Sequence, residues 1–262
     1  MKFGCCVQAT AENLKMLARC GCDCYETSLV TMPGTPEEKL REVRRISDEL
    51  GLPCAAYNCM FPGDFRLLAG EEEYERIGKY LDGALAKAEI LGGNFVSLGS
   101  GKARDIPAGM DKETAKKRFS ALVREVIAPV MKKHGFRVAV EPLSADETSF
   151  LNNCREVTEI VKMTDLPELG LLYDSYHAER GGDLLSDMKE YGSSILHAHI
   201  ASVPRERKFP AESDLSSCRN LFAALNGVGY EGAVDIEGFA DGDFETSLKN
   251  AIGVMKRAAE TN

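Results

Sequence analysis

The chain has 262 residues, a formal net charge of −9, 44% hydrophobic residues and 28% charged residues. This composition excludes a disordered chain, and the length fits either one large domain or two small ones. The acidic balance opposes general nucleic-acid binding, because such binding depends on lysine and arginine side chains that neutralise phosphates.

Short runs of β-forming residues alternate with stretches whose apolar residues recur every three or four positions, a spacing typical of amphipathic helices. The predicted strands are, in chain order, Phe3–Val7, Cys24–Leu29, Cys54–Met60, Asn94–Leu98, Arg137–Glu141, Gly170–Asp174, Ile195–Ile200 and Ala233–Glu237. The clearest helical stripes between them are Ile77, Leu81, Leu85, Ala88 and Leu91, then Phe119, Leu122, Val126 and Val130, and finally Leu248, Ile252 and Met255. Glycines such as Gly21 and Gly51 precede the next strand, where a helix needs a left-handed end residue.

Strands that alternate with helices pair in parallel through right-handed crossovers. A solenoid would repeat a sequence signature that these units lack. An open doubly wound sheet would carry a glycine-rich loop after its first strand, but Val7–Ala11 contains no glycine. The sequence therefore predicts an α/β fold, a (β/α)8 TIM barrel, as a single domain over residues 1–262.

Loop lengths indicate where a site would lie. Connections from helix to strand are short, whereas several connections from strand to helix are long, as at Phe61–Gly70, Gly99–Asp111 and Ala201–Ser216. In barrels of this kind the active site is built from the loops at the carboxyl ends of the strands. We therefore expect functional side chains at that end.

Each of the last four predicted strands carries an ionisable residue at or near its carboxyl end: Glu141, Asp174, His199 and Glu237. Three carboxylates on one rim repel each other unless a cation, a proton or a basic side chain joins them. Oxygen and nitrogen donors suit one divalent metal, with Mn²⁺ as the first expectation and Mg²⁺, Co²⁺ or Zn²⁺ as alternatives. The competing interpretation is that each acid only caps a helix or begins a solvated loop.

Further polar residues lie near this rim. His197 and Asp235 each precede a predicted ligand by two positions, so they share its inward face one step deeper in the barrel. We hypothesise that they form a pair that supports the ligands from below, although two separate core polar residues would fit equally well. Glu26 ends the second predicted strand and is expected to face the pocket, with a helix cap as the alternative.

These motifs make the chain resemble the xylose-isomerase-like barrels of the sugar isomerase/epimerase superfamily, and most of all the ketose 3-epimerases of the tagatose/psicose type. Glu141–Glu147 followed by Phe150–Asn153 matches their Glu-x5-Glu and downstream Leu-Asn. Asp174–His177 matches their Asp-x-x-His, and His197–His199 followed by Arg205 matches their His-x-His and Arg.

The resemblance implies a role for each matching residue. Glu141, Asp174, His199 and Glu237 would bind the metal, and Glu141 and Glu237 would also act as the acid/base pair. Glu147, His177 and Arg205 would bind substrate, and we add Glu26 to these contacts. One glutamate would remove the proton next to a ketose carbonyl, giving an enediolate, and the other would return a proton on the opposite face.

Two features depart from the pattern. Proline follows Glu141, where an aliphatic residue is usual in these epimerases. The loop Pro204–Lys208 carries three cations that could bind a phosphate or carboxylate of the substrate. A solvated charged loop is the competing interpretation, which we favour for Arg207 and Lys208.

Other activities share this fold. An apurinic endonuclease with three metals would need more histidines than the four in this chain. An aldose–ketose isomerase that shifts a hydride would need a second metal site, for which Glu206 and Glu212 are available. An inosose-type dehydratase could use the same ligands. A sugar-binding barrel without turnover would be expected to lose a ligand or an acid/base residue, and none is lost.

The expected partner is a small sugar or sugar phosphate, with neither nucleic acid nor membrane. No apolar run approaches the ~20 residues that cross a bilayer, and the N-terminal segment Met1–Cys6 is too short for a secretory signal. The nine scattered cysteines, without a C-x-x-C pair, fit reduced thiols. We therefore expect a cytoplasmic protein, and analogy with related barrels suggests a homo-oligomer.

Overall fold

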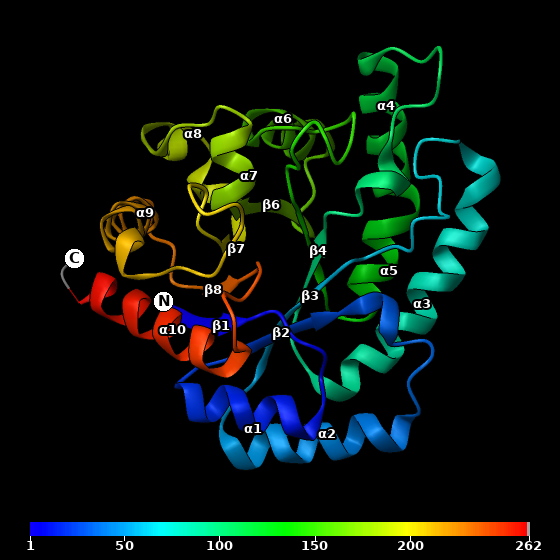
Figure 1. The fold of residues 1–262 in the computed structure, drawn as a ribbon. Coiled ribbons are helices and arrows are strands. Elements are labelled where there is room, and N and C mark those ends of the chain that lie inside the picture. Colours follow the sequence, from blue (N-terminus) through cyan, green and yellow to red (C-terminus); the bar gives the residue numbers. More distant parts are fainter. Residues whose placement is uncertain (261–262) are drawn as a thin grey trace.

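The computed structural model describes residues 1–260, and within them eight strands form one parallel sheet that curves into a barrel surrounded by helices (Figure 1). The strands are β1 (Lys2–Cys5), β2 (Tyr25–Ser28), β3 (Cys54–Asn58), β4 (Phe95–Leu98), β5 (Arg137–Val140), β6 (Leu169–Asp174), β7 (Ile195–Ile200) and β8 (Ala233–Ile236). Their order in the sheet is β1-β8-β7-β6-β5-β4-β3-β2, and each neighbouring pair is parallel. The predicted TIM-barrel architecture is confirmed.

The barrel closes between β1 and β2 without a regular ladder. A single parallel bridge joins Cys6 to Glu26, where the Val7 N–H donates to the Glu26 carbonyl oxygen at 2.9 Å. Near the amino end of the seam, the Phe3 N–H donates to the Asp23 carboxylate at 2.9 Å, and the Asp23 N–H donates to the Phe3 carbonyl at 2.7 Å. The sheet is therefore a nearly closed barrel whose seam passes Glu26.

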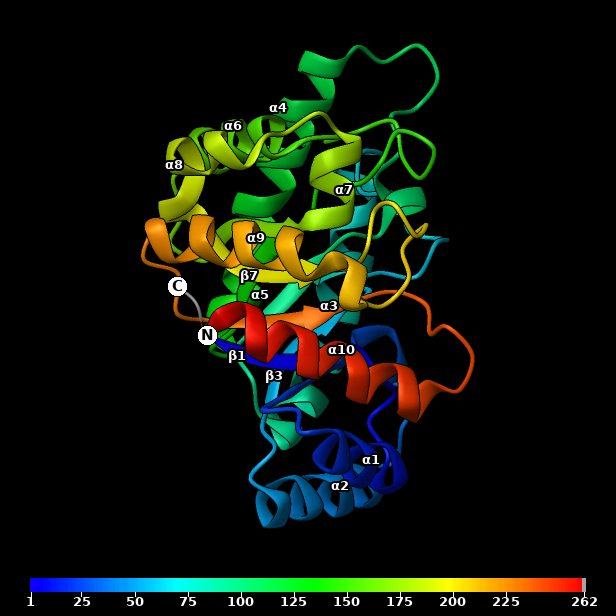
Figure 2. The ribbon, with the colours of Figure 1, turned by 60° about the vertical axis from the view of Figure 1, so that its left-hand side comes forward.

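The helices cover the outer face of the sheet and connect successive strands. They are α1 (Ala11–Cys20), α2 (Glu37–Leu50), α3 (Tyr74–Leu91), α4 (Lys112–Leu122), α5 (Ala128–Lys133), α6 (Cys154–Thr164), α7 (Ser175–Arg180), α8 (Met188–Tyr191), α9 (Leu215–Gly227) and α10 (Phe244–Ala259). Gly21 and Gly51 end α1 and α2 in the left-handed conformation, as predicted. Helix α10 packs over β1 and against α9 (Figure 2).

One predicted helical stripe changes face because a π-helical turn, Val123–Ile127, joins α4 to α5. The Ala128 N–H bonds to the carbonyl oxygen five residues back, at Val123, so the turn holds one extra residue. Val123 and Ile127 are consequently buried, whereas Val126 and Val130 are only partly buried. The predicted stripe is fully buried at its start, and its last two valines pack against the core while staying partly exposed.

Two apolar layers fix the strands. The larger one lies between the sheet and the helices and includes Val138 and Val140 of β5. Ala139, between them, belongs to a separate small cluster with Leu172 and Leu196, against which Phe95 packs. Because side chains alternate along a strand, this second cluster lies inside the barrel. It forms an apolar floor below the polar residues at the carboxyl ends of the strands.

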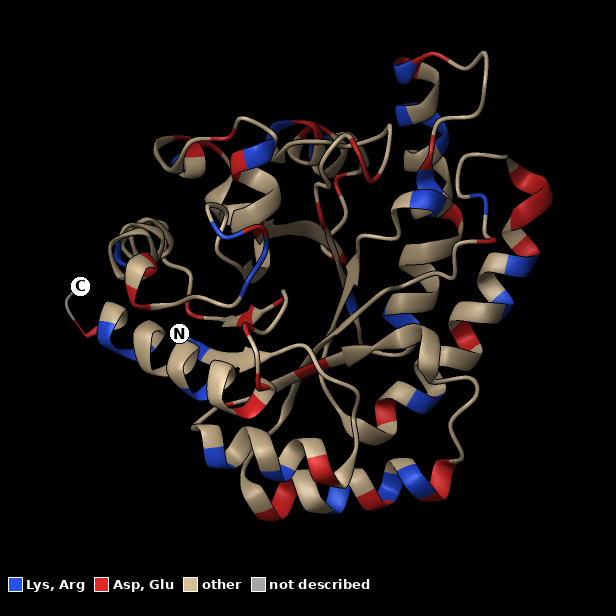
Figure 3. Ribbon diagram, viewed as in Figure 1, with Lys and Arg blue, Asp and Glu red and all other residues tan. Residues whose placement is uncertain are grey.

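Acidic and basic residues alternate over the outer helices, most visibly on α1, α2 and α3 (Figure 3). Such mixed charge is typical of helix faces in contact with water. Over residues 1–260, we find no helix with the length and hydrophobicity needed to cross a bilayer.

Gly4 of β1 leaves space that the protein fills with a carboxylate. A Cβ atom there would lie 1.9 Å from Asp235 Oδ1 and 2.7 Å from the Cys24 carbonyl oxygen. We predict that Gly4→Ala lowers the free energy of unfolding by about 2–3 kcal/mol, because the packed interior cannot absorb the methyl group. Urea unfolding monitored by circular dichroism measures this.

Gly83→Ala is the matched control. Gly83 lies inside α3, and a Cβ there would have nothing within 4 Å. Alanine should therefore raise the free energy of unfolding by about 0.5–1 kcal/mol. Equal unfolding midpoints for the two variants would contradict the packing argument at Gly4.

Candidate metal centre and active site

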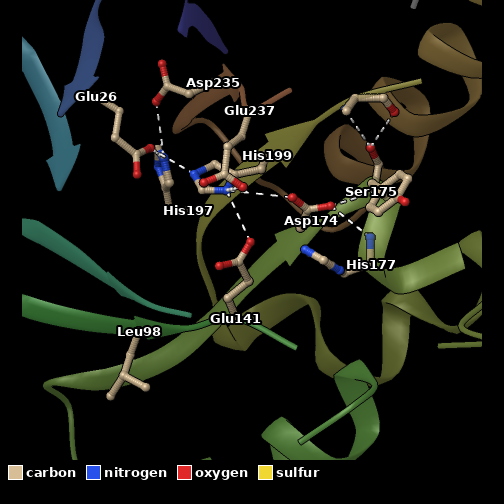
Figure 4. Close-up of polar contacts among 12 residues, drawn as sticks. Glu26, Leu98, Glu141, Asp174, Ser175, His177, His197, His199, Asp235 and Glu237 are labelled. Carbon is tan, nitrogen blue, oxygen red and sulfur yellow. Dashed lines mark hydrogen bonds and ion pairs between the residues drawn. The ribbon is translucent and has the colours of Figure 1, made fainter. Parts of the chain in front are cut away.

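The four side chains predicted to bind a metal converge at the carboxyl ends of β5, β6, β7 and β8 (Figure 4). One donor atom from each of Glu141, Asp174, His199 and Glu237 lies within 4.8 Å of the other three. His199 Nδ1 is 3.4 Å from Glu141 Oε1, 3.5 Å from Glu237 Oε2 and 3.7 Å from Asp174 Oδ2. The convergence follows from strand order, because the four strands are successive neighbours.

This donor set fits a divalent metal. Among the residues that the structure describes, Glu141 Oε1, Asp174 Oδ2 and His199 Nδ1 are buried and make no hydrogen bond. Buried polar atoms ordinarily have a partner. Two donors that each lie about 2.1 Å from one ion are roughly 3–3.5 Å apart, which is close to the separations found here. Three oxygens and one imidazole nitrogen suit Mn²⁺, Mg²⁺, Co²⁺ or Zn²⁺.

The charge balance of the cluster also favours a cation. Burial alone would lower the pKa of His199, but the charges of Glu26 and Glu237 outweigh it and raise that pKa well above its ordinary value. Burial and the neighbouring charge of Glu237 raise the pKa of Glu141. A positive charge at this position is therefore strongly stabilised, whether a proton or a metal ion supplies it.

Asp174 has two separate tasks, one for each oxygen. Oδ1 accepts the backbone N–H groups of Tyr176 at 2.7 Å and His177 at 2.9 Å, which caps the start of α7. Oδ2 is the atom that faces His199. In the sequence analysis, capping a helix and joining the cluster were alternatives for this residue. The structure shows that the Asp174 carboxylate does both, with one oxygen for each.

Glu141 follows β5 directly, and its backbone N–H donates to the Leu98 carbonyl oxygen at 3.2 Å. This bond extends the β4–β5 pairing by one residue and fixes where the side chain leaves the backbone. Gly99 leaves room for it, since a Cβ at Gly99 would lie 2.5 Å from Glu141 Oε2. The carboxylate is 4% exposed and therefore nearly buried.

Glu237 differs from Glu141 because a basic side chain neutralises it. Arg207 Nη2 donates to Glu237 Oε2 at 2.6 Å, and Arg207 Nη1 lies 3.3 Å from Glu147 Oε1. Burial opposes ionisation of Glu237, but His199 and Arg207 outweigh it and lower its pKa to about 2. The same guanidinium lies over the Tyr176 ring, 5.4 Å from the ring centre.

Arg207 reaches the site through an unusual loop. Ser202 pairs antiparallel with Lys208, and both Glu206 and Arg207 have left-handed backbones with φ of 54° and 64°. Non-glycine residues adopt this conformation at a cost, and such strain is concentrated at functional sites. The Phe239 N–H then donates to the Arg207 carbonyl oxygen at 2.8 Å.

The structure places the two arginines of this loop differently. Arg205 donates to the Phe209 carbonyl oxygen and to Asp241, so the structure does not bring it to the cluster, and its substrate contact stays a prediction. Arg207, expected in solvent, has a side chain only 20% exposed and contacts Glu237. The left-handed pair turns the second arginine inward, and sequence spacing alone does not reveal that turn.

His177 and Glu147 lie beside the cluster, as predicted. The Ser144 N–H donates to His177 Nδ1 at 3.1 Å, so the neutral ring carries its hydrogen on Nε2. Nε2 is buried, makes no hydrogen bond to any described residue, and lies 3.8 Å from Glu147 Oε1. Nε2–H is therefore available as a donor to an oxygen atom of a bound molecule.

Glu26, His197 and Asp235 are all buried, as expected for residues that face the barrel interior. His197 Nε2 lies 3.1 Å from Asp235 Oδ2, so the predicted pair is in contact. Glu26 Oε2 accepts from both His197 Nε2 and His199 Nε2 at 2.8 Å. The Glu26 side chain is 0% exposed, so the contacts that the structure shows for its carboxylate are with protein, and its substrate contact stays a prediction.

Comparison with known proteins places this site in a family. Residues 14–258 match the family described as "Xylose isomerase-like TIM barrel". A Caenorhabditis elegans protein named "Putative hydroxypyruvate isomerase" is 30% identical over 205 residues, which cover 73% of this chain and 75% of that protein. A Synechocystis sp. protein named "Probable ketose 3-epimerase" is 29% identical over 161 residues, which cover 60% of this chain and 54% of that protein. In fold, the chain is similar to a solved L-ribulose 3-epimerase, with a TM-score of 0.84, 19% identity, and coverage of 99% of this chain and 95% of that one.

The chain belongs to the xylose isomerase-like TIM barrel family. Its curated relatives carry the names of isomerases and epimerases of small molecules, together with dehydratases. The resemblance inferred from the motifs around Glu141, Asp174 and His199 is confirmed at the level of the family.

We predict that a divalent metal stabilises the protein through this cluster. At a Mn²⁺ concentration about 100 times the dissociation constant, the stabilisation is about 2.7 kcal/mol, or roughly 5–10 °C in melting temperature. Differential scanning fluorimetry with and without Mn²⁺ measures it. His199→Gln should lose the shift, whereas His134→Gln should keep it, because His134 lies away from the cluster, with its ring nitrogens on Asp82 and Glu89 of α3. An equal shift in both variants would contradict the assignment.

We also predict that Gly238→Ala releases the loop that holds Arg207. A Cβ at Gly238 would lie 2.3 Å from the Arg207 carbonyl oxygen, so the loop must move away. Limited trypsin digestion should then cut faster after Arg205, Arg207 or Lys208, and mass spectrometry identifies the cut. Gly227→Ala is the control, since a Cβ there meets nothing within 4 Å. Unchanged cleavage in Gly238→Ala would show that the loop does not depend on this close approach.

Proposed function

We propose that the protein is a divalent-metal-dependent isomerase of a small sugar or sugar phosphate, with ketose 3-epimerisation as the first candidate reaction. The observation that carries the proposal is the position of Glu141 and Glu237, which come from β5 and β8 and meet the same cluster of donor atoms. A reaction that takes a proton from one face of a carbon and returns one to the other face requires two such groups.

The proposed metal ligands are Glu141, Asp174, His199 and Glu237, with Mn²⁺ as the first candidate and Mg²⁺, Co²⁺ or Zn²⁺ as alternatives. When bound, the cation would draw electron density from the carbonyl and neighbouring hydroxyl oxygens of the substrate and so make the adjacent C–H more acidic. Asp174 suits the role of ligand alone, because its second oxygen is occupied by the cap of α7.

The proton transfers are assigned to the two glutamates. One carboxylate takes the proton from carbon, which leaves the substrate as a planar enediolate. The other carboxylic acid then donates its proton to the opposite face of the same carbon. The two glutamates exchange protonation states in each turnover, and exchange with water restores them.

Three side chains are proposed to orient the substrate. His177 Nε2–H can donate to a substrate oxygen, because its other ring nitrogen already accepts from Ser144. Glu147 can accept a hydroxyl hydrogen, since its side chain is 39% exposed at the rim. We assign to Arg207 the substrate contact that the sequence motif assigned to Arg205, because Arg207 is the arginine that lies on Glu237.

Isomerisation of a small hydroxy-oxo acid is the second candidate. A guanidinium inside the site, at Arg207, suits a substrate carboxylate, and the nematode relative carries a hydroxypyruvate isomerase name. An inosose-type dehydratase uses the same opening proton transfer and stays the third alternative. A cytoplasmic location and a homo-oligomeric state also remain predictions.

The test is a substrate panel in deuterated water with saturating Mn²⁺, followed by NMR. Free ketoses, phosphorylated ketoses and hydroxypyruvate are offered in parallel. Deuterium at C3 of a ketose together with the inverted sugar supports epimerisation. Migration of the carbonyl group supports isomerisation, and loss of a hydroxyl group supports dehydration.

Two variants test the acid/base assignment. Glu141→Gln and Glu237→Gln should each lower turnover by about 10²–10⁴-fold, the usual contribution of a proton-transfer group. Each is assayed at a metal concentration shown by titration to saturate it, so that weaker metal binding does not imitate the effect. Glu38→Gln is the control, since this glutamate lies exposed on α2, away from the cluster. Full proton exchange in both test variants would refute the assignment.

A further inference from the structure

A second polar layer lies beside the candidate metal cluster, one step deeper in the barrel, and is seen at the upper left of Figure 4. It consists of Glu26 from β2, His197 from β7 and Asp235 from β8, whose side chains are all 2% exposed or less. The ring planes of His197 and His199 stand at 87° with centres 5.2 Å apart. Both rings point their Nε2 atoms at the same carboxylate.

A single oxygen, Glu26 Oε2, accepts both imidazole hydrogens, at 2.8 Å from His197 Nε2 and 2.8 Å from His199 Nε2. A carboxylate oxygen can only accept, so each Nε2 must carry hydrogen. In neutral His199 the lone pair is therefore on Nδ1, the atom that faces Glu141, Asp174 and Glu237. Glu26 thus selects the tautomer that presents a donor atom to the cluster.

Packing alone does not explain this layer, because burying charged groups lowers the stability of the fold. Glu26 Oε1 is buried, and no described residue forms a hydrogen bond to it. Asp235 is a second buried carboxylate in the same layer, with its Oδ2 3.1 Å from His197 Nε2. Buried charged groups usually stabilise a fold less than well-packed apolar residues of the same volume. Gly4 must also lack a side chain to make room for Asp235. A role beyond packing explains why the protein buries these carboxylates despite the cost in stability.

We propose that Glu26 is the positioning residue of the metal centre, holding His199 with Nδ1 toward the three carboxylates that would bind the ion, and that His197, itself in contact with Asp235, holds Glu26 in place. The proposal rests on the metal-dependent function given above. In this proposal Glu26 acts on the metal site by orienting His199 and does not contact the substrate. Partners of metal-bound histidines commonly contribute 10- to 100-fold to metal affinity.

The first experiment titrates the full-length protein with Co²⁺, which reports binding through its visible absorption and needs no substrate. Glu26→Gln should weaken Co²⁺ binding by about 10- to 100-fold and alter the spectrum, because the amide can offer Nε2 either an oxygen or a competing NH₂ group. Asp235→Asn should cause a smaller loss, since Asp235 contacts His197 and not His199.

Asp214→Asn is the matched control. Asp214 is also buried, but it accepts from the Ser202 hydroxyl at 2.7 Å and the Ala211 N–H at 2.8 Å, with no histidine among these bonds. Its Co²⁺ affinity and spectrum should equal those of the wild type. A folded Glu26→Gln protein with wild-type Co²⁺ affinity and spectrum would overturn the proposal, because a merely structural carboxylate would lower stability alone.

The second experiment needs no variant of Glu26 and covers the case in which that variant does not fold. Imidazole ¹⁵N NMR of the wild type is tractable because the chain has four histidines, and single His→Gln variants assign them. With Mg²⁺ or Zn²⁺ bound, His199 should carry hydrogen on Nε2 and none on Nδ1. Hydrogen on Nδ1 with a bare Nε2 would overturn the proposal.

The two experiments separate this inference from the proposed function. If the wild type binds no Co²⁺, the metal-dependent function fails. The metal-free NMR spectrum then still tests the Glu26 contact, which predicts slowly exchanging Nε2–H signals from both His197 and His199. Absence of the His199 signal would refute that contact too.

Discussion

The repulsion among three carboxylates around His199 Nδ1 is the constraint on which the mouth of this barrel depends. One oxygen atom of each carboxylate lies within 4.8 Å of an oxygen of the other two, which is too close for uncompensated charges in a buried setting. The negative charge of each carboxylate is compensated in a different way. Asp174 shares its charge with the start of α7, Glu237 pairs with Arg207, and Glu141 has neither kind of partner among the described residues. A cation at the centre satisfies all three at once.

Strand register explains why these residues meet. Asp174 of β6 is level with His199 of β7, and His199 is level with Asp235 of β8. Glu237 follows β8 by one residue and bonds through its N–H to the Ile200 carbonyl oxygen at 3.3 Å. Two layers result, with cluster ligands above and Glu26, His197 and Asp235 below. The apolar floor of Ala139, Leu172 and Leu196 lies inside the same barrel.

The sequence predicts what depends on local pattern. Short runs of β-forming residues identify each strand, and the ionisable residue at the end of each late strand identifies the cluster, because parallel strands bring like ends together. Arg207 and Glu26 depend on other causes. Arg207 reaches the cluster in place of Arg205 because Glu206 and Arg207 have left-handed backbones. No glycine marks this turn in the sequence. The bond between Glu26 and His199 joins residues 173 apart, and a register shift at Tyr25/Glu26 helps to aim the glutamate.

The position of Glu26 in the fold gives its side chain a second consequence. Between β1 and β2 the described structure has no regular ladder, and the backbone bonds across the seam are those of Asp23 to Phe3 and of Val7 to Glu26, so this seam has little backbone support. From that weak point the Glu26 carboxylate reaches across the interior to two histidines of β7. A bond across the barrel resists opening of the seam in a way that a bond along it does not. The contact that links Glu26 to His199 therefore also joins β2 to β7 across the barrel, so one carboxylate connects the geometry of the site with the strands beside the seam.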